Sequence, residues 1–585
     1  MPVDEYLVYD QSIYPAATSS AFLRTASQLQ STSPTQAPPL RRIQLSEHAE
    51  LKSPTANAVV ALALECVASE HSVLVFCGGR QTCQTTAELI SKAMPPEADT
   101  PGLILDRRKD VITELRSLPI GFDDVLAFTI LAGVAFHHAG LTAEEREIIA
   151  TAYDQGTLRV IVATCTLAAG INLPARRVIL QGARIGRETI GPALLRQMRG
   201  RAGRKGRDVL GESYLCIQKN DLEDVAQLLK TDLPPVTSGL TAEKRGLKRA
   251  LLEVITTKLA THEDALRDYI RRTILFHTTQ ARDLDAMVTS TLAELIGTNL
   301  VSLDDAGHYA PSRLSLAIVG AALNPEDGMF IHGELEIAMK AFVLDTDLHT
   351  FYLFTPVQLS GLSGINWSVF RREIEHLDES GERVLGLVGV KPSLVNRMAN
   401  SGKPLPEDTP EALQTARRYR RFYAAFMLRE LCNEVPIQSV ARKYDIPRGF
   451  VQTLVQTCES FGAGMVLFCE RMGWGMLKTL LAHMTDRLHA GAQADLLDLA
   501  KIPFIKSRTA RVFWENGYTS VRAVAEADAK DLVPILALAN PKKTKVYGDD
   551  EGKYQAKMRL KANVITSAAN RIWAVEQQIE IEMDM

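Results

Sequence analysis

The sequence predicts an α/β domain built on a parallel sheet, followed by domains that are mainly α-helical. From about residue 55 to residue 220, short apolar runs alternate with stretches of helical periodicity, which is the pattern of strand–helix–strand units. Several of the runs are rich in Val and Ile and lack polar alternation, as expected for parallel strands that helices cover on both faces. Past residue 240 the strand signals become sparse and helical periodicity dominates.

Five segments of the α/β region are predicted strands. They are Ser72–Cys77, Val134–His137, Leu158–Ala163, Arg177–Leu180 and Ser213–Ile217. Because they alternate with helical segments, we expect one doubly wound domain over residues 55–235. Residues 26–42 are rich in Ser, Thr, Gln and Pro, which is typical of a flexible connector, so residues 1–54 are expected to form a linker.

The rest of the chain is predicted to be helical. Leu247–Leu259 and Glu263–Phe276 show helical periodicity, and a Pro- and Gly-rich break falls at residues 399–410. A helical block then runs to about residue 495, and a smaller one runs to the last residue. No internal repeat is visible, which excludes a solenoid architecture.

Composition and charge exclude several classes of protein. The formal net charge of −3 argues against a protein that coats nucleic acid over its whole surface, although it allows a local basic groove. The eight cysteines form no CxxC pair and no His cluster stands at ligand spacing, which argues against a metal site or a disulfide framework. The first residues lack the pattern of a signal peptide, and no apolar run approaches the roughly 18 residues of a membrane helix. We therefore expect an intracellular protein that does not enter membranes.

The strongest chemical signal is the segment from Gln197 to Gly206, with Arg201 and Arg204 three residues apart. Between residues 176 and 207 there are ten basic residues and a single acidic one, Glu188. Two arginines at this spacing share a helical face and can converge on one anion, and a guanidinium is a planar fork suited to phosphate oxygens. A solvated basic helix, or a patch for RNA or phosphoinositides, is the alternative interpretation of this segment alone.

A second signal is the segment from Val162 to Pro174, in which an apolar strand ends in hydroxyl residues and a small-residue turn. The small residues around Gly170 permit close approach to a phosphate or ribose, and Thr164 and Thr166 offer hydroxyl donors. An ordinary connection between a strand and a helix is the alternative. Upstream, His137 and His138 form a pair that is interpreted as structural, because no further ligands accompany it.

In order and spacing, these motifs resemble the second RecA-like domain of superfamily 2 helicases, and most closely the polymerase-theta-type and archaeal repair helicase group. Phe76-Cys77 with Arg80, and the stretch Glu5–Asp10, are also similar to that family. The resemblance continues more weakly through nearly the whole chain. It implies a RecA-like domain at 55–235, a winged helix at 240–325, a helical ratchet domain at 326–495 and a helix-hairpin-helix-like tail at 496–585.

Carried over to this sequence, the resemblance assigns Arg201 and Arg204 to the γ-phosphate of ATP as arginine fingers, with Gln197 beside them. Gly170 and Asn172 would line the nucleotide.

The hydroxyls of Thr164 and Thr166, together with Arg80, would hold the translocating DNA strand. Such contacts are made to the backbone, so binding is expected to be largely independent of sequence and sensitive to salt.

Weaker signals lie in the C-terminal region. Trp474 and Arg487 are predicted on one helix, where the family uses aromatic and basic residues to stack on single-stranded bases. The stretch from Val440 to Phe450 could be mistaken for a helix-turn-helix reader, but the resemblance implies that it packs into the ratchet domain. In the tail, Lys506, Arg508 and Arg511 are candidate DNA contacts. This tail departs from the hairpin pattern, because Phe504 and Lys506 occupy positions where glycines are expected.

The sequence contains no Gly-x4-Gly-Lys-Ser/Thr segment and no credible metal-binding carboxylate after an apolar strand. Neither Asp4-Glu5 nor Asp378-Glu379 has the required strand context. In the family these parts belong to the first RecA-like domain, and the chain begins where that domain should end. We therefore expect a chain that is inactive alone and that uses ATP and Mg²⁺ only if another chain supplies the first RecA-like domain.

The leading hypothesis is the C-terminal half of an ATP-dependent 3′-to-5′ DNA helicase of repair or replication, with single-stranded or 3′-tailed DNA as partner. One alternative is a non-catalytic DNA-binding or adaptor protein derived from a helicase. Another is an RNA helicase, because related enzymes carry a similar Arg-Ala-Gly-Arg block. The expected location is the nucleus in a eukaryote and the cytoplasm otherwise.

Overall fold

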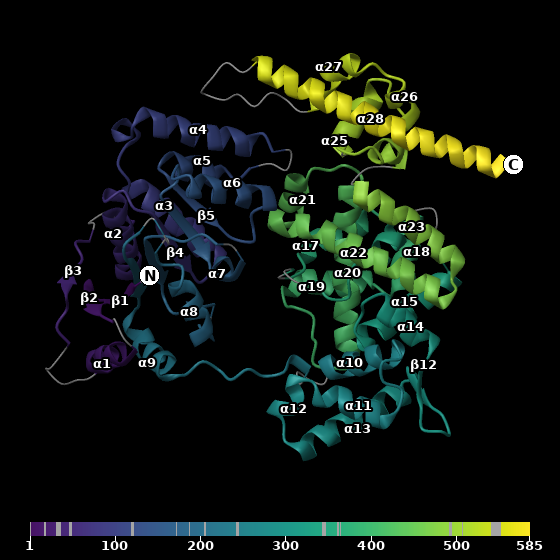
Figure 1. Ribbon diagram of the computed structural model, residues 1–585, viewed down its shortest axis with the longest axis horizontal. Helices are drawn as coiled ribbons and strands as arrows, with labels where there is room; N and C mark the ends of the chain where they lie inside the picture. The colour runs from purple at the N-terminus through teal and green to yellow at the C-terminus, as the bar shows by residue number, and fades with distance from the viewer. Residues whose placement is uncertain are drawn as a thin grey trace. The chain divides into compact units, whose positions relative to one another are not determined.

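The computed structural model describes residues 2–16, 19–30, 37–45, 50–118, 122–170, 172–186, 188–203, 206, 208–240, 245–341, 347–359, 362, 364–490, 494–505, 507–539 and 551–584. These residues form two compact units (Figure 1). The first unit comprises residues up to 235 together with the short segment 447–449, and the second comprises the remaining described residues.

The first unit is built on an eight-stranded sheet in the order β3-β2-β1-β10-β7-β4-β6-β5. The strands are β1 (Val3–Tyr9), β2 (Ser12–Pro15), β3 (Arg41–Arg42), β4 (Val73–Cys77), β5 (Val134–His137), β6 (Val160–Thr164), β7 (Arg177–Gln181) and β10 (Gly211–Cys216). Six of these strands run parallel, whereas β2 and β3 pair in the antiparallel direction at one edge. A parallel-dominated α/β sheet is the fold class that the apolar runs predicted.

The five predicted strands are confirmed as β4, β5, β6, β7 and β10, with ends that differ by no more than two residues. The reason is visible in their burial. Every residue of β4 and β5 is buried, and β6 is buried from Val160 to Ala163. A strand that is covered on both faces has no polar alternation, so an unbroken Val- and Ile-rich run is the correct signal for it.

Residues 1–54 have a different role from the linker expected there. β1 lies inside the sheet, where it pairs in parallel with β10 and in antiparallel with β2. Helix α1 (Ser19–Gln30) packs against α9 (Leu222–Lys230), although almost 200 residues separate them in sequence. Composition describes only local preference, whereas these segments gain their structure from contacts with residues more than 190 positions away.

The remaining helices of the first unit connect the strands. They are α2 (Pro54–Ala68), α3 (Arg80–Ala93), α4 (Gly102–Arg116), α5 (Asp124–Leu131), α6 (Ala143–Asp154), α7 (Thr166–Gly170) and α8 (Pro192–Arg199), with a small hairpin of β8 (Arg184–Ile185) and β9 (Glu188–Thr189). Their starts follow from capping chemistry. Ser53 caps α2 with Pro54 as its first residue, and Thr142 and Glu145 form a capping box at the start of α6.

The second unit is mainly helical and contains two hydrophobic cores, one over residues 247–488 and one over residues 496–569. Its first elements are α10 (Arg245–Thr256), α11 (Glu263–Arg271), α12 (Ile274–Thr278), α13 (Ala281–Gly297), the hairpin of β11 (Val301–Leu303) and β12 (Tyr309–Pro311), and α14 (Arg313–Gly320). These belong to the larger core together with the next nine helices.

Those nine helices are α15 (Pro325–Lys340), α16 (Leu348–Phe354), α17 (Trp367–Glu375), α18 (Glu379–Val388), α19 (Pro392–Ser401), α20 (Pro410–Cys432), α21 (Ile437–Tyr444), α22 (Arg448–Met472) and α23 (Gly475–Ala490). The predicted break at 399–410 is confirmed. Helix α19 ends at Ser401 and is capped by Gly402, whose φ of +64° favours glycine, and α20 begins after the capping residue Thr409.

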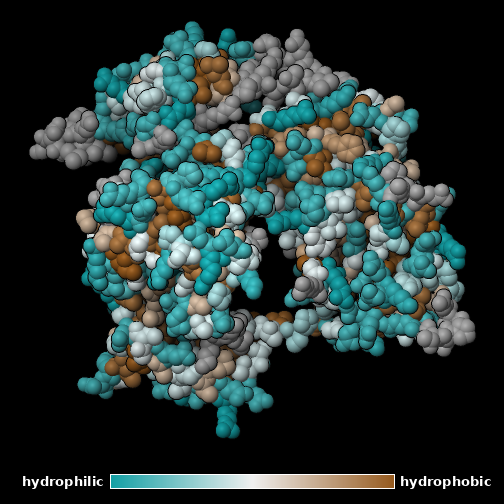
Figure 2. All heavy atoms as spheres, turned by 180° about the vertical axis from the view of Figure 1, so that it is seen from behind, coloured by the Kyte–Doolittle hydropathy of each residue, from teal (hydrophilic) through white to brown (hydrophobic). Residues whose placement is uncertain are grey.

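The smaller core belongs to the last helices, which are α24 (Leu497–Ala500), α25 (Ser507–Glu515), α26 (Val521–Ala525), α27 (Ala529–Ala539) and α28 (Glu551–Asp584). Within the described residues, no helix combines the length and the apolar composition that crossing a membrane requires. Figure 2 shows one face of the molecule, on which hydrophilic residues predominate and hydrophobic residues form separate groups.

Candidate functional site

The carboxyl ends of four neighbouring parallel strands meet at one edge of the sheet. In the pairing register, Cys77 at the end of β4 lies opposite both Thr164 of β6 and Gln181 of β7, and His137 of β5 lies opposite Ala163. We call this row, with the loops that follow it, the carboxyl edge. In open α/β sheets ligands bind in the crevice outside the carboxyl ends of the strands, so a binding site is expected at this edge.

Two threonine hydroxyls face each other at the carboxyl edge. The Oγ1 atoms of Thr164, the last residue of β6, and Thr166, the first residue of α7, are 2.9 Å apart. Thr164 is half-buried and Thr166 is exposed. A hydroxyl carries one donor and two acceptor positions, so this mutual bond leaves hydrogen-bonding capacity on both side chains for a further polar group.

Arg201 lies against the loop that follows α7. Its Nε donates to the carbonyl of Ala168 at 3.0 Å and its Nη1 donates to Oδ1 of Asn172 at 3.0 Å, while Nη2 also donates to Ala168. The backbone on either side is fixed to the same loop, because Ala175 and Ala202 form a bridge. The structure therefore brings together Asn172 and Arg201, which the sequence placed in separate motifs.

The other residues predicted to contact the nucleotide are Gln197, Gly170 and Arg204. Gln197 is exposed on α8, on the turn before Arg201, while Leu195 and Met198 of the same helix are buried. Gly170 is the last residue of α7. Arg204 lies outside the described residues, so its position relative to Arg201 stays a prediction.

His138 is a site residue that sequence reasoning interpreted as structural. It is 5% exposed, its Nδ1 accepts a hydrogen bond from the backbone N–H of Gly140 at 3.1 Å, and its Nε2 has no partner among the described residues. Burial, together with the charge of Arg80, lowers the pKa of His138 to about 4. At neutral pH the ring is therefore uncharged with its proton on Nε2, which makes Nε2 a buried donor that lacks an acceptor.

The neighbouring His137 has the same character. It is 4% exposed, burial lowers its pKa to about 4, and its Nε2 also has no partner within the described residues. Arg80, at the start of α3, is exposed. The sequence analysis noticed the histidine pair but interpreted it as structural. The available signal was its position at the end of a buried strand, which corresponds to that of Thr164 and Thr166 at the end of β6.

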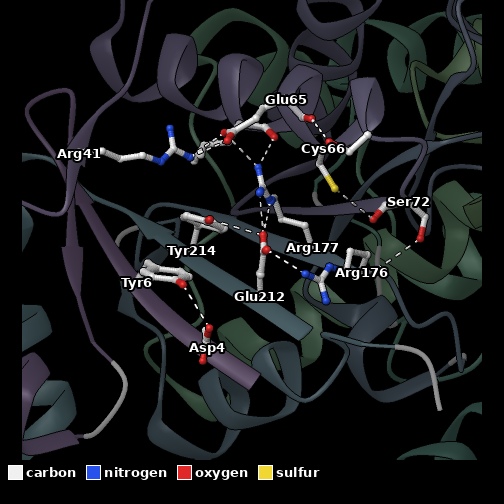
Figure 3. Close-up of polar contacts among 12 residues, drawn as sticks. Asp4, Tyr6, Arg41, Glu65, Cys66, Ser72, Arg176, Arg177, Glu212 and Tyr214 are labelled. Atoms are coloured by element: carbon white, nitrogen blue, oxygen red, sulfur yellow. Dashed lines mark hydrogen bonds and ion pairs between the residues drawn. The ribbon is translucent and has the colours of Figure 1, made fainter. Parts of the chain in front are cut away.

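The opposite, amino edge of the sheet carries a polar network of another kind (Figure 3). Arg177, the first residue of β7, is 7% exposed and lies between two carboxylates. Its Nε donates to Glu212 at 2.7 Å, and its Nη1 donates to Glu65 at 3.3 Å and to the carbonyl of Leu62 at 2.9 Å. Its guanidinium also lies 4.8 Å from the centre of the Tyr214 ring.

The partners of Arg177 are themselves paired. Glu212 also accepts from Arg176 at 3.2 Å, and Glu65 accepts from Arg41 at 2.7 Å. Burial raises the pKa of Glu65, but the hydrogen bond from Arg41 and the charge of Arg177 outweigh it, so this pKa lies below its usual value. Every charged group in this network has an opposite charge beside it.

Glu5, the first residue of the stretch that resembles the helicase family, makes a contact within the first unit. Glu5 of β1 forms an ion pair with Arg199 at the end of α8, and the Arg199 guanidinium also lies 6.0 Å from the centre of the Phe22 ring. Burial lowers the pKa of Arg199 to about 10. Glu5 thus ties the first strand to the helix that precedes Arg201.

The candidate DNA contacts of the C-terminal region are mostly engaged within the protein. Trp474 lies just before α23 rather than on it, half-buried, with its ring 5.5 Å from His332 and 6.2 Å from Phe468. Arg487 is 8% exposed and donates to Asp347 at 2.7 Å. Arg511 donates to both Glu434 and Asp495, which raises its pKa.

Lys506 lies outside the described residues, and of Arg508 the structure describes only the backbone, in α25. For Trp474, Arg487, Lys506, Arg508 and Arg511, contact with DNA therefore stays a prediction. Among the described residues, no group of three or more His, Cys, Asp or Glu side chains is arranged to hold a metal ion.

Four models of protein families match the chain. The helicase conserved C-terminal domain matches residues 111–206, which include Thr164, Asn172 and Arg201. A helix-turn-helix domain matches residues 211–302. The helical domain of the DNA pol Q helicase like region matches residues 325–488, and a domain of unknown function matches residues 494–573.

Curated relatives match most of the chain. DNA polymerase theta of Mus musculus is 33% identical over 538 residues, which are 87% of this chain and 21% of that protein. Helicase POLQ-like of Homo sapiens is 30% identical over 508 residues, 83% of this chain and 45% of that protein. ATP-dependent DNA helicase Hel308 of Caldivirga maquilingensis is 26% identical over 508 residues, 83% of this chain and 64% of that protein. The chain thus spans less than two thirds of the length of each of these relatives.

Proposed function

Because the chain belongs to the superfamily 2 helicases of the polymerase theta and Hel308 type, whose C-terminal portion it carries, we propose that it works as the second motor domain and DNA-binding region of an ATP-dependent 3′-to-5′ DNA helicase. In this proposal the carboxyl edge of the sheet holds the backbone of a single strand, and Arg201 acts on ATP bound by a first RecA-like domain. The observation that carries the proposal is a row of polar groups at this edge: histidine Nε2 atoms without a partner among the described residues, and threonine hydroxyls with spare hydrogen-bonding capacity.

The chemistry of the carboxyl edge suits a phosphate backbone. Arg80 supplies an exposed positive charge, and Thr164 and Thr166 supply hydroxyls that bond to each other. His138 supplies a buried Nε2–H that lacks an acceptor. Phosphate oxygens accept from all three kinds of donor, and such contacts carry no base sequence information. We therefore expect sequence-independent, salt-sensitive binding of single-stranded or 3′-tailed DNA.

The nucleotide contacts centre on Arg201. Its guanidinium already lies beside Asn172, so both side chains can meet one nucleotide, with Gln197, Gly170 and Arg204 nearby in sequence. ATP fits these donors. Mg²⁺ does not fit the described side chains, because no carboxylates are gathered at this edge, and the metal would have to be held by the first RecA-like domain. An arginine placed on the γ-phosphate is worth about 10³-fold or more in turnover.

The second unit would guide the DNA. We assign a winged helix to residues 240–325, a ratchet domain to residues 326–495 and a helix-hairpin-helix-like tail to residues 496–585, after a doubly wound RecA-like domain at 55–235. The helix-turn-helix match over residues 211–302 and the polymerase theta helical match over residues 325–488 support this order. In a eukaryote such a protein would act in the nucleus, and otherwise in the cytoplasm.

The test is ATP hydrolysis by the purified chain, measured with and without 3′-tailed DNA. Because the sequence has no phosphate-binding Gly-x4-Gly-Lys-Ser/Thr loop, we expect no turnover while DNA binding is retained. Adding a chain that carries a first RecA-like domain should restore turnover, and Arg201→Ala/Arg204→Ala should abolish it. DNA-stimulated turnover by the chain alone, lost in the double variant, would contradict the proposal.

One observation favours a second candidate, a non-catalytic DNA-binding adaptor. All three nitrogens of the Arg201 guanidinium donate within its own domain, to Ala168 of α7 and to Asn172 beyond it, so this side chain has partners without a nucleotide. If the unaltered chain keeps DNA binding and no added motor domain restores its turnover, the adaptor is the better description. Preferential binding of single-stranded RNA over DNA of equal length would favour an RNA helicase instead.

A further inference from the structure

A groove of about 440 Å³ separates two helices of the second unit, α11 and α13, which lie together with α12 in Figure 1. Its volume falls within the range of ligand sites in proteins. Aliphatic side chains of both helices line it: Leu266, Ile270, Leu284, Val288, Leu292 and Ile296. Phe276 of α12 and Tyr309 of β12 also line the groove. The proposed helicase site does not use this feature.

The lining residues follow helical spacing on both sides. On α11 they are Glu263, Leu266, Arg267, Ile270 and Arg271, and on α13 they recur from Ala281 to Ile296 at steps of three and four. Each helix therefore turns one continuous face toward the groove. A groove along the nine residues of α11 has room for roughly two to three turns of a third helix, at about 1.5 Å per residue.

The groove is lined by two carboxylates and two arginines, but only one arginine is paired among the described residues. Both Glu263, at 2.7 Å, and Asp285, at 3.7 Å, form ion pairs with Arg267. Arg271, in the last turn of α11, is exposed, and no ion pair to it is found within the described ranges. Arg282, at the start of α13, is likewise exposed without an ion pair in the described structure. The groove thus presents an apolar floor and an unmatched cation.

We propose that this groove binds an acidic amphipathic helix of a partner protein, with the apolar face of that helix on the aliphatic floor and its carboxylates at Arg271. Helices dock into such grooves through apolar residues at steps of three and four, and an arginine is suited to a carboxylate because its fork matches two oxygens. An acidic peptide is favoured over nucleic acid, because a floor of aliphatic side chains offers nothing to phosphates or base edges.

The probe is a fluorescein-labelled peptide of about three helical turns, with leucines on one face and glutamates in its first turn. A second peptide carries lysines in place of the glutamates, and a third has the same composition with the leucine spacing scrambled. Fluorescence anisotropy with the full chain should show saturable binding of the first peptide only. Arg271→Glu should weaken its binding roughly five- to tenfold and improve binding of the lysine peptide, which is a change that unfolding does not produce.

Two further variants separate the groove from general effects. Val288→Glu, on the half-buried floor, should abolish binding of the glutamate peptide, with circular dichroism used to confirm that the variant is folded. Arg442→Glu changes an equally exposed arginine outside the groove and should leave the affinity unchanged. Equal binding of the scrambled peptide would overturn the proposal. Displacement of the peptide by single-stranded DNA, with Arg271→Glu weakening the DNA as much as the peptide, would reassign the groove to nucleic acid.

Discussion

The two edges of the sheet in the first unit both carry buried polar residues. The polar atoms at the amino edge have hydrogen-bond partners, whereas some of those at the carboxyl edge have none among the described residues. At the amino edge, Arg177 bonds to Glu65, Glu212 and a carbonyl, and each of these carboxylates has a second arginine. At the carboxyl edge, the Nε2 atoms of His137 and His138 have no partner among the described residues. The two edges belong to one sheet, but the compared residues lie on different strands: the histidines at the end of β5, Arg177 on β7 and Glu212 on β10.

This difference separates stability from function. A buried charge that has its partners holds a structure together, and it leaves nothing for a ligand to bind. A buried donor without an acceptor reduces the stability of the free protein, and it becomes favourable when an outside acceptor arrives. This criterion predicts that the amino edge maintains the fold and that the carboxyl edge binds a ligand, as the proposed function requires.

The largest expected effect is at the amino edge. Arg177→Met removes a 7% exposed guanidinium and leaves Glu212, whose side chain is 16% exposed, without one of its two cations. Breaking a buried pair in this way costs about 3–5 kcal/mol of the free energy of unfolding. Urea unfolding of the first unit can be measured with a thiol reagent, which reacts with Cys216 only when unfolding exposes this fully buried side chain.

The matched control for that variant is Arg41→Ala. Arg41 bonds to the same Glu65, but its side chain is 44% exposed, so its loss is expected to cost less than about 1 kcal/mol. If Arg41→Ala destabilises the first unit as much as Arg177→Met does, burial is not what makes the amino edge structural, and the comparison between the edges fails.

A smaller effect concerns pH and the carboxyl edge. The pKa of His138 is about 4 in the folded protein and about 6.5 when unfolded, so only the unfolded chain takes up the proton between these values. Stability is therefore lost as pH falls through this window, by about 2 kcal/mol for this residue between pH 7 and pH 5. His138→Phe should remove that part of the pH dependence, as measured by urea unfolding at both pH values.

The exposed His71 provides the reference for the pH experiment, because His71→Phe should leave the slope unchanged. The amino edge responds in another range. The pKa of Glu65 is lowered in the folded protein, so its contribution is present above about pH 4.5 and lost only at lower pH. Because His137 has the same lowered pKa, part of the slope between pH 7 and pH 5 should remain in His138→Phe. A slope as steep as that of the unaltered chain would show that His138 does not contribute to it.

The smallest expected change in stability belongs to the threonine pair. The hydroxyls of Thr164 and Thr166 bond to each other, so Thr164→Val/Thr166→Val removes both partners at once and leaves neither unsatisfied. Such a replacement is nearly neutral, and we expect a change within about 0.5 kcal/mol in urea unfolding. A loss above about 2 kcal/mol would show that the pair supports the fold.

The sequence predicted the strands between residues 72 and 217 better than the strands within residues 1–54. The buried strands β4 to β7 were recognisable because burial on both faces leaves an uninterrupted apolar run. β1 was missed, because Val3-Asp4-Glu5-Tyr6 mixes polar and apolar residues and its partner strand β10 lies more than 200 residues away. Pairing at that distance leaves no local pattern in the sequence.

The site was only partly predictable for a related reason. The resemblance to the helicases brought Asn172 and Arg201 into one proposed site, and the two side chains are in contact. His138 was interpreted as structural, because a histidine pair without further ligands usually is. Sequence does not reveal whether a buried ring has a hydrogen-bond partner. In the same way, nothing in the sequence showed that Arg487 and Arg511 would already be bonded to carboxylates.

The central claim is that the carboxyl edge binds the nucleic-acid backbone while the amino edge maintains the fold. The most direct test is fluorescence anisotropy of a labelled single-stranded oligonucleotide with the full chain and two variants. Thr164→Val/Thr166→Val, which should fold normally, is expected to weaken binding roughly tenfold, because two hydrogen bonds to phosphate are lost. Arg176→Gln, which removes a charge from the amino edge, should leave the affinity within about twofold. Unchanged binding by the threonine variant, or a larger loss in Arg176→Gln, would contradict the account.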